Sequence, residues 1–249
     1  MRLAIIGGTG VANHWPELSQ AALTTPFGAP SDRPREVRIG DATVWFLARH
    51  GTPHRIPPHR INYRANIHAL RLLGVDAVLA LNAVGGIRAD LAPGSLLAPD
   101  QLIDYTWGRA HTFSDGGSSA LKHVDFTRPF GGVLRERLLD AARSAEEPVI
   151  DGGCVAVTQG PRLETAAEVM KLARDGADVV GMTTMPEAAL AREAGLDYAS
   201  LCMVANPGAG LADGEITEED IHAVLGQAMR RVHHVIETLV RLLAAAGTG

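Results

Sequence analysis

In the N-terminal part of the chain, the residues best suited to bind a ligand are basic, hydroxyl and glycine residues that follow apolar segments. The turn GGTG (7–10) offers backbone N–H groups and the hydroxyl of Thr9, which can together hold an anion. Arg49 and His50 end a later apolar segment, and residues 42–75 contain no acidic residue. Because Arg presents a planar fork of donors, this stretch suits a phosphate-like anion. Thr9, Arg49 and His50 are therefore candidate anion ligands, although a plain tight turn also explains GGTG.

A metal site is the alternative for the histidines of this stretch. His50, His54 and His59 are spaced four and five positions apart, which could bring imidazoles together. The intervening prolines break any helix that would align them, the neighbouring arginines repel a divalent cation, and no carboxylate offsets that charge. We therefore expect no metal, and we interpret His54 and His59 as parts of a solvated surface loop.

Two later apolar segments are followed by residues that could contact a ligand but also have simple structural explanations. Small residues surround Ala83 in NAVGG (82–86), where a backbone can approach a ligand closely or a strand can simply leave a sheet. Glu164 stands at the expected start of a helix, where the helix dipole favours a carboxylate in any case. Both explanations stay open at each position.

Met182, Thr183 and Asn206 stand at the ends of the last two apolar segments. Met is more often a core residue than a ligand contact, and Thr183 could instead cap the helix that follows it. Asn206 stops a long apolar run before Pro-Gly-Ala-Gly (207–210), so it could be a turn residue or hold a ligand. Together, the segment ends favour a ligand with a phosphate group, an apolar part and a hydrogen-bonding ring edge.

Strand-like and helical patterns alternate along the chain, and the candidate residues above lie at or near the ends of the strand-like ones. The predicted strands cover 3–8, 42–50, 76–86, 152–160, 177–184 and 197–206, and the predicted helices cover 62–74, 132–145, 164–176, 186–195 and a C-terminal segment that Thr217 caps. Near-continuous apolar runs indicate strands buried on both faces. We expect one α/β domain over residues 1–249 around a mixed or parallel sheet, with the ligand at the carboxyl ends of the strands.

Composition narrows the class of protein. The chain has 249 residues, of which 46% are hydrophobic and 20% charged, and a formal net charge of −5. It has no basic stripe for a nucleic acid, no apolar run of membrane-spanning length and no signal-peptide pattern at the N-terminus. Two cysteines in apolar segments, Cys154 and Cys202, suit a reducing compartment. We expect a cytoplasmic protein with no nucleic-acid or membrane partner.

The order of the motifs resembles that of the trimeric purine nucleoside phosphorylases, and most closely their methylthioadenosine phosphorylase branch. The matching motifs are GGTG (7–10), RHG (49–51), NYRANIHAL (62–70), NAVGG (82–86), TQGPRLET (158–165), GMTTMPEAALAREAGLDYA (181–199) and NPGAG (206–210). The resemblance implies an α/β domain whose central twisted mixed sheet curls into a distorted barrel flanked by helices, assembled as a homotrimer. It also implies phosphorolysis of a purine nucleoside, with inorganic phosphate as co-substrate and no cofactor.

The resemblance also implies roles for individual residues. The implied phosphate contacts are Thr9, Arg49, His50, Ala83 and Thr183. The implied contacts with the ribose or the base are Leu163, Glu164, Met182, Asn206, Pro207 and Gly208. His123, in LKHVDFTRPF (121–130), matches a position that reaches the 5′ end of a neighbouring subunit's substrate. Asn206 and His50 are the catalytic candidates.

Two positions depart from the methylthioadenosine branch and match enzymes for 6-oxopurines. That branch has Ser in place of Glu164 and Asp-x-Asp in place of the residues 206–208. An ionised Glu164 only accepts hydrogen bonds, so it can pair with the N1–H of hypoxanthine but not with the N1 lone pair of adenine. Asn206 can donate to O6 and present its carbonyl to a protonated N7. These two residues indicate a 6-oxopurine base, and the resemblance to the methylthioadenosine branch implies that the base is carried on a 5-methylthioribose.

Other functions remain alternatives. Within the family these are phosphorolysis of inosine or guanosine, which depends on the 5′ pocket, and phosphorolysis of methylthioadenosine, which Glu164 and Asn206 disfavour. A nicotinamide-dependent enzyme would need a dinucleotide fingerprint and a downstream acid, and GGTG supplies neither cleanly. A non-catalytic nucleotide-binding module would be favoured if phosphate failed to bind.

Overall fold

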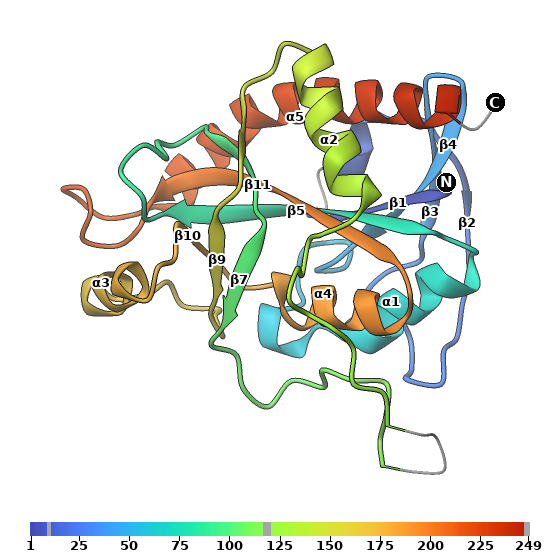
Figure 1. Cartoon of the computed structure of the whole chain (residues 1–249), viewed down its shortest axis with the longest axis horizontal. Coiled ribbons are helices and arrows are strands. Elements are labelled where there is room, and N and C mark those ends of the chain that lie inside the picture. The colour runs from blue at the N-terminus through green and yellow to red at the C-terminus, as the bar shows by residue number, and fades with distance from the viewer. Residues whose placement is uncertain (9–10, 117–120, 247–249) are drawn as a thin grey trace.

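The computed structural model describes residues 1–8, 11–116 and 121–246, in which eleven strands form one mixed sheet with helices packed on it (Figure 1). The strands are β1 (Leu3–Gly7), β2 (Glu17–Gln20), β3 (Arg35–Ile39), β4 (Ala42–Ala48), β5 (Ala77–Gly86), β6 (Leu96–Ala98), β7 (Gln101–Asp104), β8 (Val149–Asp151), β9 (Cys154–Val157), β10 (Val179–Gly181) and β11 (Asp197–Pro207). The helices are α1 (Tyr63–Leu72), α2 (Val133–Ser144), α3 (Ala166–Arg174), α4 (Thr184–Glu193) and α5 (Glu218–Ala246), with short 3-10 turns η1 (Val11–His14) and η2 (Pro58–Arg60).

The sheet branches at β5. One edge of β5 pairs along its length with β11 in parallel, while the other edge pairs first with β1 in parallel and then with β10 in antiparallel. The main path runs in the order β2-β3-β4-β1-β5-β10-β9-β7, and β11 continues the sheet through β6 to β8. Both pairing directions occur, so the predicted α/β class with a central mixed sheet is confirmed.

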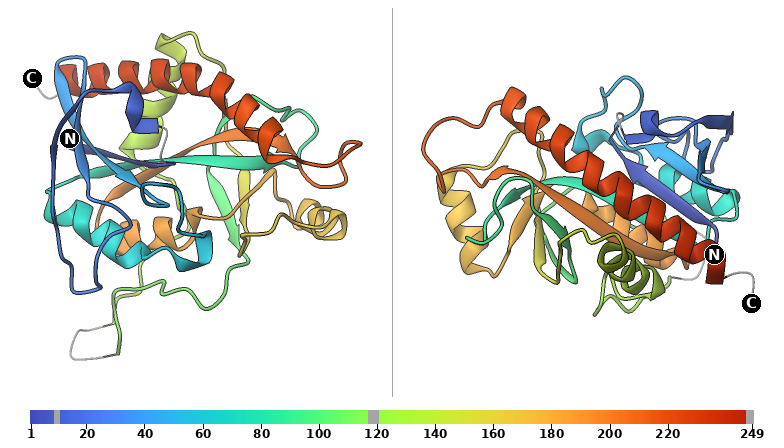
Figure 2. Two further views of the ribbon diagram at one scale, coloured as in Figure 1. Left: turned by 180° about the vertical axis from the view of Figure 1, so that it is seen from behind. Right: turned by 90° about the horizontal axis from the view of Figure 1, so that it is seen from above.

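Helices cover both faces of the sheet. α2 and α5 lie on one side of the long strands β5 and β11, and α1 and α4 lie on the other (Figures 1 and 2). α2 contacts α5, and α1 contacts α4, so each face carries one packed pair of helices. Because both faces are covered, the central strands are buried on both sides, as their continuous apolar runs predicted.

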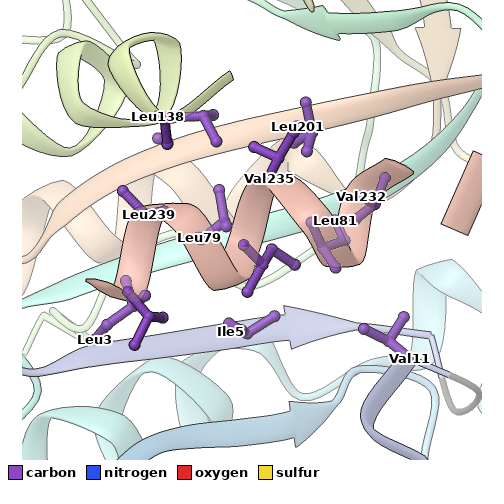
Figure 3. Packing of buried hydrophobic residues seen from close by; sticks show 14 of the residues in the cluster. Leu3, Ile5, Val11, Leu79, Leu81, Leu138, Leu201, Val232, Val235 and Leu239 are labelled. Carbon is purple, nitrogen blue, oxygen red and sulfur yellow. The ribbon is translucent and has the colours of Figure 1, made fainter. Parts of the chain in front are cut away.

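The core on the α5 side fixes the C-terminal helix against the sheet (Figure 3). Val232, Val235 and Leu239 recur at helical spacing along α5 and are fully buried. They pack in one cluster with β1 and β5 residues that include Ile5 and Leu79. Full burial of each such side chain contributes about 1.5–3 kcal/mol, so this stripe holds α5 in place.

Among the described helices, none combines the length and apolar character that a membrane crossing requires.

Candidate active site

Several strand ends meet at one cavity of about 1000 Å³. β1, β4, β5 and β11 run parallel to one another, so their carboxyl ends lie at the same edge of the sheet. β10 crosses the end of β5 in the opposite direction, which brings the residues after Gly181 beside Ala83. Most of the predicted site residues line the cavity, namely Arg49, His50, Ala83, Leu163, Glu164, Met182, Thr183, Asn206 and Gly208.

Two of the described site residues that were predicted are not part of this lining. Pro207 ends β11 next to the cavity but is not among its lining residues. His123 is exposed, on the long connection between β7 and α2, and does not line the cavity of its own chain. Thr9 lies outside the described residues.

Arg49 follows β4 and is held by a buried carboxylate. Its Nε lies 2.7 Å from Glu187 Oε2 and its Nη2 lies 2.8 Å from Glu187 Oε1, while Nη1 donates to Leu81 O at 3.0 Å. Nη2 also reaches Ile6 O at 3.4 Å, so these bonds use four of the five N–H groups of a guanidinium. Burial alone lowers the pKa of Arg49, but Glu187 outweighs it and raises that pKa above its ordinary value. Arg49 therefore stays charged, with one N–H at Nη1 left over for a ligand.

Glu187 was not predicted as a site residue. It lies in the first turn of α4 with no exposed surface, and Tyr198 donates its hydroxyl to Oε1 at 2.9 Å. A glutamate in the first turn of a helix is ordinarily explained by the helix dipole, so nothing local marks it as a partner of Arg49. Glu187 and Tyr198 together fix the orientation of the guanidinium.

His50 is held by the loop that follows it. Its Nδ1 lies 2.8 Å from Ile56 O, and its ring stacks on the His54 ring at a centroid distance of 4.2 Å. The pKa of His50 is lowered to about 4, mainly by burial and also by the charges of Arg49 and His54, while the bond to Ile56 acts in the opposite direction. His54 is exposed, as predicted for a surface loop, but it also lines the cavity, whereas His59 does not.

Thr183 belongs to a chain of buried hydrogen bonds. Asn82 Nδ2 donates to Thr183 Oγ1 at 2.9 Å, and Ser200 Oγ donates to Asn82 Oδ1 at 2.9 Å. Thr183 stands at the N-cap position of α4, as the alternative expected, but its side chain makes no capping bond. Because its oxygen accepts from Asn82, its own O–H is free to donate to an anion.

Glu164 lies before α3 and not inside its first turn. The N-cap of α3 is Thr165, which forms a capping box with Glu168, so Glu168 fills the helix-start role considered for Glu164. Thr158 Oγ1 donates to Glu164 Oε1 at 2.6 Å. Thr158 thereby orients the carboxylate, whose Oε2 is left to accept from a ligand.

Asn206 lies at an irregularity near the end of β11. The pairing of β11 with β5 shifts register between Val204 and Asn206, which is typical of a β-bulge and re-aims the side chains that follow. Asn206 Nδ2 donates to Pro207 O at 2.7 Å. One amide N–H and the carbonyl oxygen of Asn206 are then left for the cavity that it lines.

Met182 is positioned by a glycine and by a second buried arginine. Gly160 has a φ of +58°, and a Cβ at that position would overlap Met182 Sδ. Arg109 Nη1 donates to Met182 O at 2.8 Å, and its Nη2 donates to Gln159 O at 2.9 Å. Arg109 thus joins the segments after β9 and β10, a role that the sequence analysis missed.

The comparisons with known proteins agree on one family. The model of the phosphorylase superfamily matches residues 2–241. This chain belongs to the phosphorylase superfamily. Among its relatives is a Xylella fastidiosa protein named "Probable S-methyl-5′-thioinosine phosphorylase", 50% identical over 96% of this chain and 98% of that protein. Another is the 6-oxopurine nucleoside phosphorylase of Pyrococcus furiosus, 41% identical over 98% of this chain and 91% of that protein.

A solved structure supports the same assignment. The methylthioadenosine phosphorylase of Schistosoma mansoni, in complex with adenine, superposes with a TM-score of 0.92 at 34% identity. The match covers 98% of this chain and 92% of that chain. As a nucleoside phosphorylase, the family member described here is a pentosyltransferase, and its predicted fold class is confirmed.

The phosphorylase cavity has an apolar wall that the sequence analysis did not predict. It is made by residues at the start of α5 and just before it, namely Ile216, Ile221, Leu225 and Met229. Two polar residues, Glu218 and His222, line the cavity in the same region. Leu225 and Met229 also pack against the core on the α5 side of the sheet. Among the described residues, no group of three or more His, Cys, Asp or Glu could hold a metal ion.

Proposed function

We propose that this phosphorylase cleaves S-methyl-5′-thioinosine with inorganic phosphate, releasing hypoxanthine and 5-methylthioribose 1-phosphate. The observation that carries the proposal is that Glu164 and Asn206 line one cavity whose other wall, from α5, is apolar. The two polar residues suit the edge of a 6-oxopurine, and the apolar wall suits a thioether. The name of the Xylella fastidiosa relative supports the same substrate.

We assign base recognition to the hydrogen-bonding groups of Glu164 and Asn206 that make no bond within the protein. Glu164 Oε2 accepts from N1–H of hypoxanthine, while adenine would place a lone pair against it. Asn206 donates its remaining N–H to O6 and accepts from a protonated N7. A mismatch at a buried donor or acceptor costs about 1–3 kcal/mol per group, so the pair discriminates strongly between the two bases.

We assign phosphate binding to a second group of residues that line the cavity. Arg49 Nη1, the Thr183 hydroxyl and the backbone at Ala83 supply donors, and Thr9 adds a further hydroxyl in this proposal. Glu187 and Asn82 are positioning residues, because they hold Arg49 and Thr183 in place. Met182 packs against the ribose, between the base and the phosphate.

The reaction needs positioning and charge stabilisation and no covalent enzyme intermediate. A phosphate oxygen bonds to C1′ as the bond from C1′ to N9 breaks, and the electron pair of that bond moves into the purine. The proton that monohydrogen phosphate brings balances the charge of the departing base. Asn206 stabilises the negative charge that develops on the ring, which is the catalytic contribution we assign to it. No cofactor is part of the proposal.

The first experiment is phosphate-dependent base release from methylthioinosine, inosine and methylthioadenosine, measured side by side on the purified protein. We expect strong turnover of methylthioinosine and very weak turnover of methylthioadenosine. Preference for methylthioadenosine would refute the roles of Glu164 and Asn206. Preference for inosine would refute the thioether site and support a second candidate, an inosine or guanosine phosphorylase, which Glu218 and His222 favour because they could hold a 5′-hydroxyl.

We also propose that the protein acts as a cytoplasmic homotrimer with no nucleic-acid or membrane partner. His123 is exposed and lies outside its own cavity, which suits a residue that reaches the 5′ end of a neighbour's substrate. Trp107 and Leu121, on the same connection, are 72% and 64% exposed, as expected for apolar residues that a second subunit covers. Analytical ultracentrifugation tests the trimer, and a monomer with full activity would contradict it.

A further inference from the structure

Arg109, on the connection after β7, is a buried arginine that donates to two separate segments of the chain. Only 8% of the residue is exposed. Its Nη2 donates to Thr158 O at 3.2 Å and to Gln159 O at 2.9 Å. Its Nη1 donates to Met182 O at 2.8 Å and to Met185 O at 2.6 Å. The two ends of one planar group thus hold one segment after β9 and another after β10.

The backbone pairing between these two segments ends early. β9 and β10 pair in parallel as far as Gly181. A last backbone bond joins Thr158 N to Gly181 O at 2.8 Å. Beyond this bond, the described residues 159–165 and 182–186 are joined by hydrogen bonds through Arg109. The rigid guanidinium therefore sets how far apart the two segments lie.

Each of the two segments carries residues that the proposed function uses. Thr158, whose carbonyl accepts from Arg109, donates its hydroxyl to Glu164 Oε1 at 2.6 Å. Met182, whose carbonyl also accepts from Arg109, lines the cavity together with Glu164. Arg109 is thus connected to the base carboxylate through Thr158, and to the ribose contact directly.

The partners of Arg109 are uncharged. Besides the backbone carbonyls, Gln159 Oε1 accepts from Nε at 3.2 Å, and the Tyr63 hydroxyl lies 3.3 Å from Nη1. Burial lowers the pKa of Arg109, and Tyr63 and Asp104 act in the opposite direction. A buried cation without a bonded counter-charge is costly, so an uncharged side chain would fill the same space with less loss of solvation. The cost indicates that the fork of donors is used.

We infer that Arg109 is a positioning residue for base recognition, because it fixes Thr158, and through Thr158 the Glu164 carboxylate, relative to Met182. This inference rests on the proposed function, in which Glu164 accepts from N1–H of a 6-oxopurine. A carboxylate held in one place accepts from that N1–H and opposes the lone pair of adenine N1. A carboxylate that is free to turn away loses the first bond and avoids the second mismatch. Loss of Arg109 therefore weakens the preference for a 6-oxopurine.

Arg109→Lys tests the inference, because lysine keeps the charge but has no planar fork to hold both segments. The measured quantity is kcat/KM for methylthioinosine divided by kcat/KM for methylthioadenosine. The folded fraction of the enzyme cancels in this ratio, so a loss of stability alone does not change it. We expect the ratio to fall by about tenfold, the effect of one hydrogen bond to a charged group. An unchanged ratio would overturn the inference.

Arg135→Lys is the matched control. Arg135 also donates to two backbone carbonyls, Ala98 O and Pro99 O, each at 2.9 Å, but it is not among the residues that line the cavity. The variant should keep the wild-type ratio whatever its stability. A fall in the ratio as large as that in Arg109→Lys would show that the loss of any such arginine relaxes the site, and would overturn the specific role of Arg109.

A double-mutant cycle tests the connection through Thr158. Thr158→Val removes the hydroxyl that donates to Glu164 and should lower the ratio by itself. If Arg109 acts through Thr158, the double variant has nearly the same ratio as Thr158→Val alone. Two effects that multiply would contradict this connection.

A milder variant decides the question if Arg109→Lys does not fold. Gln159→Met removes the side-chain oxygen that accepts from Arg109 Nε and leaves the backbone carbonyls in place. We expect the same ratio to fall by about threefold, because one bond to the charged group is lost while the others remain. A wild-type ratio in this variant would overturn the inference.

The outcomes separate this inference from the proposed function. A wild-type preference for methylthioinosine that Arg109→Lys retains would refute the inference alone. A wild-type preference for methylthioadenosine would refute both. If the wild-type protein releases no base from either nucleoside, the function is refuted, and the dissociation constants of hypoxanthine and adenine decide the inference. Titration calorimetry on the same variants measures them, and their ratio should change as described for kcat/KM.

Discussion

Arg49 and Glu187 form a two-point ion pair in which the two side chains are only 2% and 0% exposed. A buried pair of this kind adds little net stability compared with apolar residues, but loss of one partner leaves a charge without compensation. The pair also joins the end of β4 to the start of α4, and so connects two walls of the cavity. Its loss should affect both the fold and the anion site.

Glu187→Ala should therefore destabilise the protein strongly. We expect the free energy of unfolding to fall by about 3–5 kcal/mol, because the buried Arg49 guanidinium loses its counter-charge. Urea unfolding measures the change. Tyr198→Phe is the matched control, since it removes only a neutral donor to the same carboxylate, and should cost about 1.5–3 kcal/mol. Similar losses in the two variants would show that the charge pair has no special role.

Glu164→Ala should impair the use of methylthioinosine. The N1–H of the base would lose its acceptor, so kcat/KM should fall by about 10- to 100-fold. Steady-state base release measures the effect. Glu168→Gln is the control, because Glu168 belongs to the same helix start but is occupied with Thr165 and Arg162, and it should retain wild-type kcat/KM. A Glu164→Ala variant with wild-type kcat/KM would contradict the assignment of Glu164 to the base site.

Thr183→Val should raise the KM for phosphate while leaving the KM for the nucleoside nearly unchanged. The variant removes the hydroxyl donor aimed at the anion, and we expect a rise of about tenfold. Thr184→Val is a close control: its buried Oγ1 has no hydrogen-bond partner among the described residues, so its loss should be neutral or stabilising. If Thr184→Val changes the KM for phosphate as much as Thr183→Val does, Thr183 has no specific role there.

His50 should make stability depend on pH. Its pKa in the folded protein is about 4, below the ordinary value of 6.5, so between these values the unfolded chain binds a proton that the folded chain does not. Stability from this residue is thus present above pH 6.5 and is lost as the pH falls to 4, with a total of about 3 kcal/mol. The measurement is chemical unfolding of wild type and His50→Gln across this range. The two curves should converge at low pH, whereas parallel curves would refute the shift.

The candidate site was predictable to the extent that its residues follow apolar runs. Arg49, Ala83 and Asn206 each come at or near the end of a strand, and parallel strands end at the same edge of a sheet. The positioning residues carry no such signal. Glu187 contacts Arg49 across 138 positions of sequence, and Asn82 contacts Thr183 across 101, so only the folded structure shows what they do.

The helices and strands were likewise predictable where an apolar pattern marks them. All six predicted strands and all five predicted helices are present, with ends shifted by a few residues. The strands that were not predicted are short or lie at an edge of the sheet, as with β2 (Glu17–Gln20), whose four residues are all exposed. No apolar run marks β2, because it buries little. Its pairing with β3, and not its own side chains, makes it a strand.

The length of α5 and its packing in the core limit how the cavity can open. The helix has 29 residues, so at 1.5 Å per residue it is a rod about 44 Å long. Its first turns form the apolar wall, while Val232 to Val240 are locked in the core. A loop can swing on its own, but this wall can retreat only by bending the rod or by pulling aliphatic side chains out of the interior. The wall that α5 contributes is therefore a fixed boundary of the cavity, and any opening must come from the other segments that line it.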